Sequence, residues 1–98
     1  MPRRVEIEAE ATAEAIEARI WYAASDTDLA VDFMRELDRA VEVIADRPDR
    51  WPVDRRDTRK YHLRRFPFCI VYLFDPQRVR IIAIAHDRRK PEYWKDRI

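Results

Sequence analysis

Four residues in the second half of the chain have side chains suited to phosphodiester chemistry: Arg65, His86, Arg88 and Tyr93. Metal-free cleavage of RNA needs a base for the 2′-hydroxyl, an acid for the leaving oxygen, and cations that stabilise the transition state. His86 and Tyr93 can transfer protons, and arginine guanidinium groups match phosphate oxygens. These four residues are therefore candidates for a catalytic site.

The same residues also have a purely structural interpretation. Arg65 and Arg88 can instead form ion pairs with Asp87, with Glu92 or with the acidic first half of the chain. His86 follows an apolar run, where a histidine is commonly a hydrogen-bonded residue at a strand end. The sequence leaves both interpretations open.

Further residues near these four are candidates for binding a nucleic acid or a partner protein: Arg55, Arg56, Arg59, Lys60, Arg64, Arg89 and Trp94. Residues 55–60 form the densest basic run. Such a run is usually a solvated loop, but this one precedes the predicted central strand and can grip a phosphate backbone or a partner.

The formal net charge of +1 hides a strong asymmetry between the halves of the chain. Residues 1–46 carry 5 basic and 12 acidic groups, a net charge of −7, and residues 47–98 carry 15 basic and 7 acidic groups, a net charge of +8. A basic half suggests a polyanion or an acidic partner. The alternative is that the two halves neutralise each other in the fold.

Composition argues against cofactors and metals. Glycine is absent, which excludes glycine-rich phosphate loops and the dinucleotide-binding fingerprint. Cys69, the only cysteine, lies in an apolar run and is interpreted as a small core residue, and His62 as exposed or structural. No His, Cys or carboxylate group has metal-ligand spacing, so neither a metal nor a cofactor is expected.

The length of 98 residues predicts a single domain over residues 1–98. No apolar stretch approaches the ~20 residues of a membrane span. Arg3 and Arg4 are followed by alternating Val, Glu and Ile rather than a signal peptide, so a cytoplasmic location without membrane contact is expected.

The apolar pattern predicts a strand, two helices and then three strands. Alternation over residues 5–9 indicates a strand, and helical spacing follows over about 11–24 and again from about 27 to 46 or 47, where Pro48 ends the helix. The first helix is expected to bury Ala13, Ile16, Ile20 and Ala23. The second is expected to bury Ala30, Phe33, Leu37, Ala40 and Ile44. The short connection between them predicts an antiparallel hairpin.

The second half reads as a loop over 50–59, an edge strand around Tyr61 and Leu63, strands over 68–74 and 79–85 joined by a turn at 75–78, and a charged tail. The predicted fold is α+β: an N-terminal strand, an antiparallel helical hairpin, then a three-stranded, mainly antiparallel sheet covered by the hairpin on one face.

Both faces of the predicted β-hairpin are apolar. Strict alternation puts Ile82 and Ile84 on one face and Val79, Ile81 and Ala83 on the other. Two short helices can cover only one face. The other must be covered by the tail through Tyr93 and Trp94, by a second copy, or by a partner protein.

Two segments resemble the RelE/ParE toxin superfamily. Residues 63–72 (LRRFPFCIVY) resemble its segment of an arginine, Phe-Pro-aromatic, and a hydrophobic strand that ends in Tyr. Residues 86–97 (HDRRKPEYWKDR) resemble the ParE-like ending of His, two arginines, Pro, and Tyr-Trp before a final arginine. The N-terminal strand, Ala-rich helix and Trp-Tyr also agree, so the resemblance covers nearly the whole chain.

The resemblance implies a growth-inhibiting toxin of a type II toxin–antitoxin pair, neutralised by a cognate antitoxin protein in a hetero-oligomer. RelE-like members cut mRNA on the ribosome without metal, and ParE-like members poison DNA gyrase. The segment 66–68, the ending and the near-zero charge favour the ParE-like group. A RelE-like mRNA endonuclease and a non-toxic binding module are the alternatives. The match to RNA-cutting members assigns catalytic roles to Arg65, Arg88 and a tail aromatic, Tyr93 or Trp94.

Overall fold

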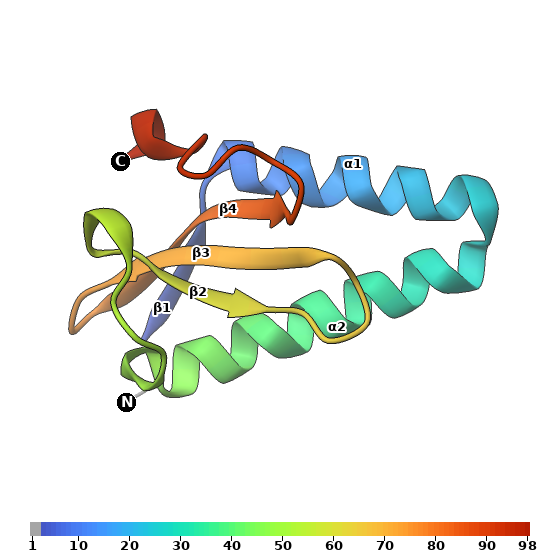
Figure 1. Cartoon of the computed structure of the whole chain (residues 1–98). Helices are drawn as coiled ribbons and strands as arrows, with labels where there is room; N and C mark the ends of the chain where they lie inside the picture. Colours follow the sequence, from blue (N-terminus) through green and yellow to red (C-terminus); the bar gives the residue numbers. More distant parts are fainter. Residues whose placement is uncertain (1–2) are drawn as a thin grey trace.

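The computed structural model describes residues 3–98 and has a helical hairpin packed on one face of a four-stranded sheet (Figure 1). In chain order the elements are β1 (Arg4–Ile7), α1 (Ala9–Ser25), α2 (Thr27–Asp46), β2 (Arg59–His62), β3 (Phe68–Phe74) and β4 (Arg78–His86). Short 3-10 turns lie at Pro48–Arg50, Arg55–Asp57 and Lys95–Arg97. The predicted α+β class is confirmed. Neither helix of the described chain has an apolar stretch that would cross a bilayer.

The sheet has the strand order β1-β4-β3-β2. Strands β2, β3 and β4 are antiparallel neighbours, as predicted. The N-terminal strand adds a fourth member, because β1 pairs in parallel with β4 and places Val5 opposite Val79. A parallel neighbour needs a long crossover connection, and here the chain between β1 and β4 contains both helices as well as β2 and β3. The sheet is therefore mixed, with one parallel edge.

Local side-chain hydrogen bonds fix the helix junction and the β-turn. Asp26 lies between the helices, and its Oδ1 accepts a hydrogen bond from the N–H of Asp28 at 2.8 Å, which caps α2. In the turn between β3 and β4, Asp75 Oδ1 accepts from the N–H groups of Gln77 and Arg78, each at 2.9 Å. The helix junction and the β-turn both lie where the sequence predicts them.

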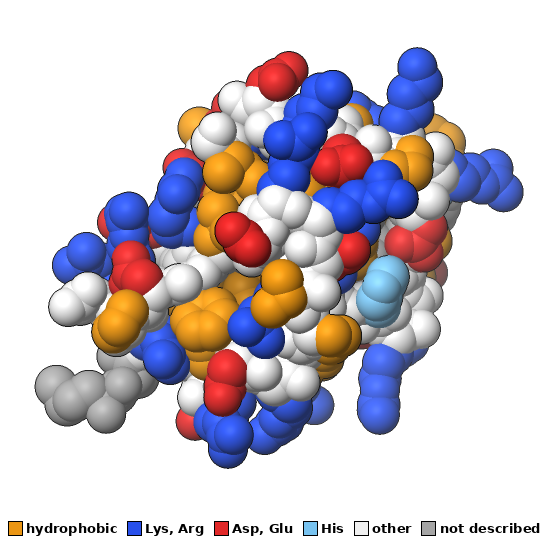
Figure 2. Space-filling view, turned by 60° about the vertical axis from the view of Figure 1, so that its left-hand side comes forward, with side chains coloured by type: hydrophobic (Ala, Val, Ile, Leu, Met, Phe, Trp, Pro, Cys, Tyr) orange, Lys and Arg blue, Asp and Glu red, His pale blue; other side chains and the backbone are white. Residues whose placement is uncertain are grey.

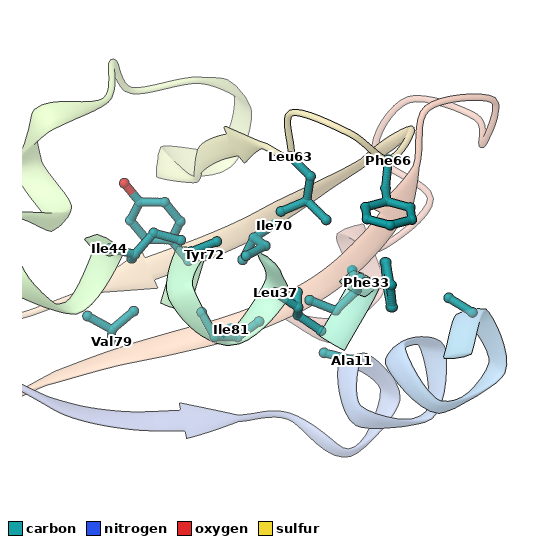
Figure 3. Close-up of a cluster of buried hydrophobic side chains, with 13 residues drawn as sticks. Ala11, Phe33, Leu37, Ile44, Leu63, Phe66, Ile70, Tyr72, Val79 and Ile81 are labelled. Atoms are coloured by element: carbon teal, nitrogen blue, oxygen red, sulfur yellow. The ribbon is translucent and has the colours of Figure 1, made fainter. Parts of the chain in front are cut away.

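The main core lies between the hairpin and the sheet. The predicted stripe of α2 is buried in full, with Phe33 and Ile44 at 0% exposure. It packs against β3 and β4, where Ile70, Tyr72 and Ile81 are fully buried (Figure 3). The Tyr72 hydroxyl donates to the carbonyl of Pro48 at 2.7 Å, so the polar end of this buried ring is satisfied.

The prediction of which face of α1 is buried is wrong. The helix turns its small residues toward the sheet: Ala11, Ala15 and Ala18, followed by Tyr22. The expected core residues Ile16 and Ile20 are 43% and 59% exposed. Alanine side chains allow the helix axis to approach the sheet closely, whereas isoleucines at the contact would hold it away. Large apolar side chains of α1 therefore face solvent.

The second face of the sheet is covered by the tail. Trp94 is 2% exposed and packs in a second cluster with Cys69, Val71, Ile82, Ala83 and Ala85. In Figure 1 the tail leaves the end of β4 and doubles back across this side of the molecule. Of the three coverings considered from the sequence, the tail is the one found. No second copy or partner is needed to bury this face.

A β-bulge breaks the alternation predicted for β4. Tyr72 pairs with Ile81 and its neighbour Val71 pairs with Ala83, so Ile82 is an extra residue without a cross-strand partner. Ile82 consequently lies in the tail cluster while Ile84 lies in the main core. The expectation that these two isoleucines share a face is wrong for this reason.

Candidate functional site

Three of the four candidate catalytic residues come from segments that meet at one end of the sheet. Arg65 lies in the connection between β2 and β3, His86 ends β4, and Arg88 lies in the turn that follows. The two segments are joined by a hydrogen bond from the N–H of Asp87 to the carbonyl of Pro67 at 2.8 Å. The topology thus brings these segments together, as expected.

The side chains of Arg65 and His86 nevertheless contact different parts of the protein. Arg65 Nη2 lies 3.4 Å from Asp32 Oδ2 of α2, and its guanidinium lies over the ring of Phe66. His86 packs edge-on against Phe68, with 5.0 Å between ring centroids. Arg65 lines a charged groove beside α2, and His86 lines an apolar groove beside α1. Arg65 and His86 therefore do not share one groove.

Two further contacts give His86 and Tyr93 structural roles. The Nδ1 atom of His86 accepts from the N–H of Arg88 at 3.1 Å, which shapes the turn after β4. Tyr93 donates its hydroxyl hydrogen to Glu14 Oε2 at 2.6 Å. Burial, followed by the neighbouring Glu14 carboxylate, raises the pKa of Tyr93 well above its usual value. This phenol stays protonated at neutral pH and is poorly suited to act as a base.

Glu14 is the centre of a network that joins α1, β4 and the tail. Its carboxylate accepts from the N–H of Ile84 at 3.0 Å and from Arg97 Nη1 and Nη2 at 2.9 and 3.1 Å, besides Tyr93. The side chains of Glu14 and Arg97 are only 14% and 18% exposed. The network fixes the tail against the helix. No local pattern in the sequence indicates this network, because the partners of Glu14 lie 70 to 83 residues away along the chain.

Most of the basic run is engaged within the protein. Arg55 Nη1 and Arg56 Nε bind the two carboxylate oxygens of Glu92 at 3.0 and 2.8 Å, and these contacts hold the pKa of Glu92 below its usual range. Lys60 Nζ lies 3.1 Å from Asp54 Oδ2. The two arginines tie the loop to the tail, and Lys60 ties β2 to the same loop.

The other binding candidates differ in accessibility. Arg59 donates to the carbonyls of Asp49 and Trp51, so it anchors a loop. Arg64 is exposed and has no ion pair within residues 3–98. Arg89 is exposed and stacks over the Tyr93 ring at 3.9 Å. Trp94, expected to contact a nucleic acid or a partner protein, is instead buried in the second core cluster.

The charge asymmetry is partly neutralised within the fold. Ion pairs between the two halves join Arg65 to Asp32, Arg78 to Glu6, Arg80 to Glu8 and Arg97 to Glu14. On the face seen in Figure 2, Lys and Arg side chains alternate with Asp and Glu, and hydrophobic atoms appear between them. This arrangement supports the neutralisation alternative for the residues so paired.

An apolar groove of about 500 Å³ lies beside α1 and is a second feature that the sequence pattern did not indicate. It is lined by Ile20 and Trp21 on the helix side and by Phe68, Ile84 and His86 on the sheet side. Trp21 is 74% exposed. Periodicity alone assigned Ile20 to the core, which concealed this surface.

The fold also gathers three side chains able to bind a metal: His62, Cys69 and Asp87. Their ligand atoms all lie within 4.8 Å of one another. The spacing argument against a metal site did not detect them, because they come from three different segments. Burial raises the pKa of the Cys69 thiol to about 11.

Comparisons with known proteins agree with one another. The family model described as "ParE toxin of type II toxin-antitoxin system, parDE" matches residues 5–91. A solved structure described as "Chromosomal ParDE TA system from P. aeruginosa" superposes with a TM-score of 0.76 at 15% sequence identity, covering 86% of this chain and 95% of that one. None of the curated proteins matches the sequence.

Proposed function

The chain belongs to the ParE toxin family of type II toxin–antitoxin systems, and from this we propose that it inhibits bacterial growth by binding DNA gyrase until a cognate antitoxin neutralises it. The family match over residues 5–91 is the observation that carries the proposal.

The site geometry favours a protein-binding inhibitor over an mRNA endonuclease. An endonuclease needs an acid, a base and phosphate-binding cations around one reacting phosphate. Here Arg65 and His86 line separate grooves, and the Tyr93 hydroxyl is bound to Glu14. Inhibition by binding needs only an exposed, complementary surface.

Growth measurements test the toxin assignment. Induced expression of the chain alone should arrest bacterial growth, and co-expression of the small protein encoded next to it should restore growth. If the folded protein accumulates without slowing growth, the proposal that it is a toxin is wrong, and a non-toxic binding module is the alternative.

The target is tested with purified gyrase and with RNA from induced cells. We expect loss of supercoiling activity, and single substitutions Arg65→Ala and Arg88→Ala should weaken toxicity by degrees, since each removes only binding contacts. In a nuclease the same losses would lower the cleavage rate on the order of 10²-fold. Abundant cuts within translated codons, abolished by either substitution, would make the protein an endonuclease instead.

We further propose that the apolar groove beside α1 receives an amphipathic segment of the antitoxin. Contiguous exposed apolar surface commonly marks a protein interface, and such a groove suits a segment with regularly spaced apolar anchors. Ile16, Ile20 and Trp21 all expose more than two fifths of their surface on this helix.

Trp21→Ala tests this surface directly. A central tryptophan anchor typically contributes about 2 kcal/mol or more to binding, so the dissociation constant should rise roughly 30-fold. Val53→Ala is the matched control, because Val53 is 57% exposed but lies in the loop before β2. Equal affinities for both variants would place the antitoxin elsewhere.

A further inference from the structure

The metal-ligating cluster of His62, Cys69 and Asp87 lies where three strands end. His62 is the last residue of β2, Cys69 is the second residue of β3, and Asp87 directly follows β4. One ligand atom from each lies within 4.8 Å of the other two. None of these residues belongs to the apolar groove or to the charged groove.

The register of the sheet explains this proximity. His62 pairs directly with Cys69, and Cys69 pairs with Ala85 on its other side. Directly paired residues project from the same face of a sheet, and so do residues two apart along a strand. Asp87 is two residues beyond Ala85, so its side chain continues the same row. The three ligands therefore share the face that the tail covers.

The three side chains are not committed to other partners. Within residues 3–98, neither the imidazole of His62 nor the carboxylate of Asp87 has an ion pair or a side-chain hydrogen bond. Cys69 is free and 7% exposed, whereas His62 and Asp87 are exposed. The thiol forms the floor of the cluster and two polar groups form its open side.

We propose that His62, Cys69 and Asp87 bind a divalent transition-metal ion of the Zn²⁺ class, with water at a fourth position. An imidazole nitrogen, a thiolate and a carboxylate oxygen are the donors that zinc takes in proteins. Metal–ligand bonds of roughly 2.0–2.3 Å in a tetrahedral site place the donors about 3.3–3.8 Å apart. The exposed side chains can rotate to close the remaining distance.

Such an ion would connect the ends of β2 and β3 to the residue from which the tail departs. On binding, the thiol proton of Cys69 leaves to solvent and the sulfur bonds the metal. The bound ion would then stabilise the folded chain by mass action. This inference concerns a separate part of the sheet and does not rest on the proposed gyrase inhibition.

Metal titration of the full chain, first stripped with a chelator, tests the site. Zn²⁺ should bind with one-to-one stoichiometry and a dissociation constant of about 10⁻⁶ M or tighter in competition with a chromophoric chelator. Co²⁺ should give a thiolate-to-metal charge-transfer absorption and tetrahedral visible bands, which report the sulfur ligand directly. Binding weaker than about 10⁻⁴ M, or a Co²⁺ complex without the thiolate band, would overturn the proposal.

Substitutions identify the ligands. His62→Ala and Asp87→Asn each change an exposed side chain, so the fold is expected to survive, and each should weaken Zn²⁺ binding about 100-fold or more. Cys69→Ser should abolish the charge-transfer band. Asp38→Asn, an exposed carboxylate on α2, is the matched control and should leave affinity unchanged. Unchanged affinity in His62→Ala, with the fold verified by circular dichroism, would refute the site.

Discussion

Removing the carboxylate of Glu14 should cost the protein a substantial part of its stability. Four hydrogen bonds converge on this group from Ile84, Tyr93 and Arg97, and its ion pair with Arg97 is mostly buried. Removing one member of a buried pair typically costs about 3–5 kcal/mol, because the other charge is left without a partner. Both side chains retain some exposure, so we expect Glu14→Ala to lower the free energy of unfolding by about 3 kcal/mol.

Urea unfolding monitored by tryptophan fluorescence measures this loss. For a small domain, about 3 kcal/mol corresponds to a fall of about 1–3 M in the unfolding midpoint. Glu17→Ala is the control, since Glu17 is an exposed residue of the same helix without an ion pair in residues 3–98. Glu14→Gln, which keeps the shape and loses the charge, should fall between the two. A loss below about 1 kcal/mol for Glu14→Ala would refute the reasoning, because it would show that solvent replaces these contacts.

Three further changes probe the two clusters. Ile82→Ala removes a fully buried side chain from the tail cluster and should cost about 3 kcal/mol, lowering the melting temperature by about 12–24 °C; an unchanged melting temperature would place Ile82 at the surface. Trp94→Ala should uncover Cys69, so thiol reagents should label it faster than in the parent protein; an equal labelling rate would mean that the tail does not cover this face. Burial raises the pKa of Tyr72 from 10.0 to about 12, so its contribution to stability is complete below pH 10 and is lost as pH rises toward 12. Tyr72→Phe should remove that part of the alkaline destabilisation in urea midpoints, and a slope identical to that of the parent would contradict the assignment.

Elements with strong local signals could be predicted from the sequence. The apolar run 68–74, the Asp-Pro turn after it and the helix stop before Pro48 each depend on neighbouring residues, and the structure reproduces them. The buried stripe of α2 could also be predicted, because the polar and apolar residues of this helix lie on clearly separate faces.

Features decided by long-range packing could not be predicted. Helix α1 is apolar on more than one side, so periodicity could not decide whether its alanines or its isoleucines face the sheet. The bulge at Ile82 depends on how β3 and β4 match in register. It shifts part of β4 to the opposite face.

The candidate site shows the same division. The sequence order of the strands predicts that Arg65, His86 and Arg88 lie near one end of the sheet. It does not predict that Arg65 and His86 line separate grooves. The Glu14 network joins α1 to residues of β4 and the tail that lie 70 to 83 positions away along the chain. The metal-ligating cluster joins residues from three segments. Linear spacing carries no information about such contacts.

The parallel pairing of β1 with β4 limits how early the sheet can form during synthesis of the chain. Arg4 finds its partner Arg78 only after a further 74 residues have been synthesised. At about 5–20 residues per second, that wait lasts roughly 4–15 s. Once α2 has been made, its apolar stripe has no strand to cover it until β3 begins 22 residues later and β4 begins 32 residues later. A growing chain can form its helical hairpin early, but the domain is assembled as a unit only when β4, which pairs with both β1 and β3, has emerged.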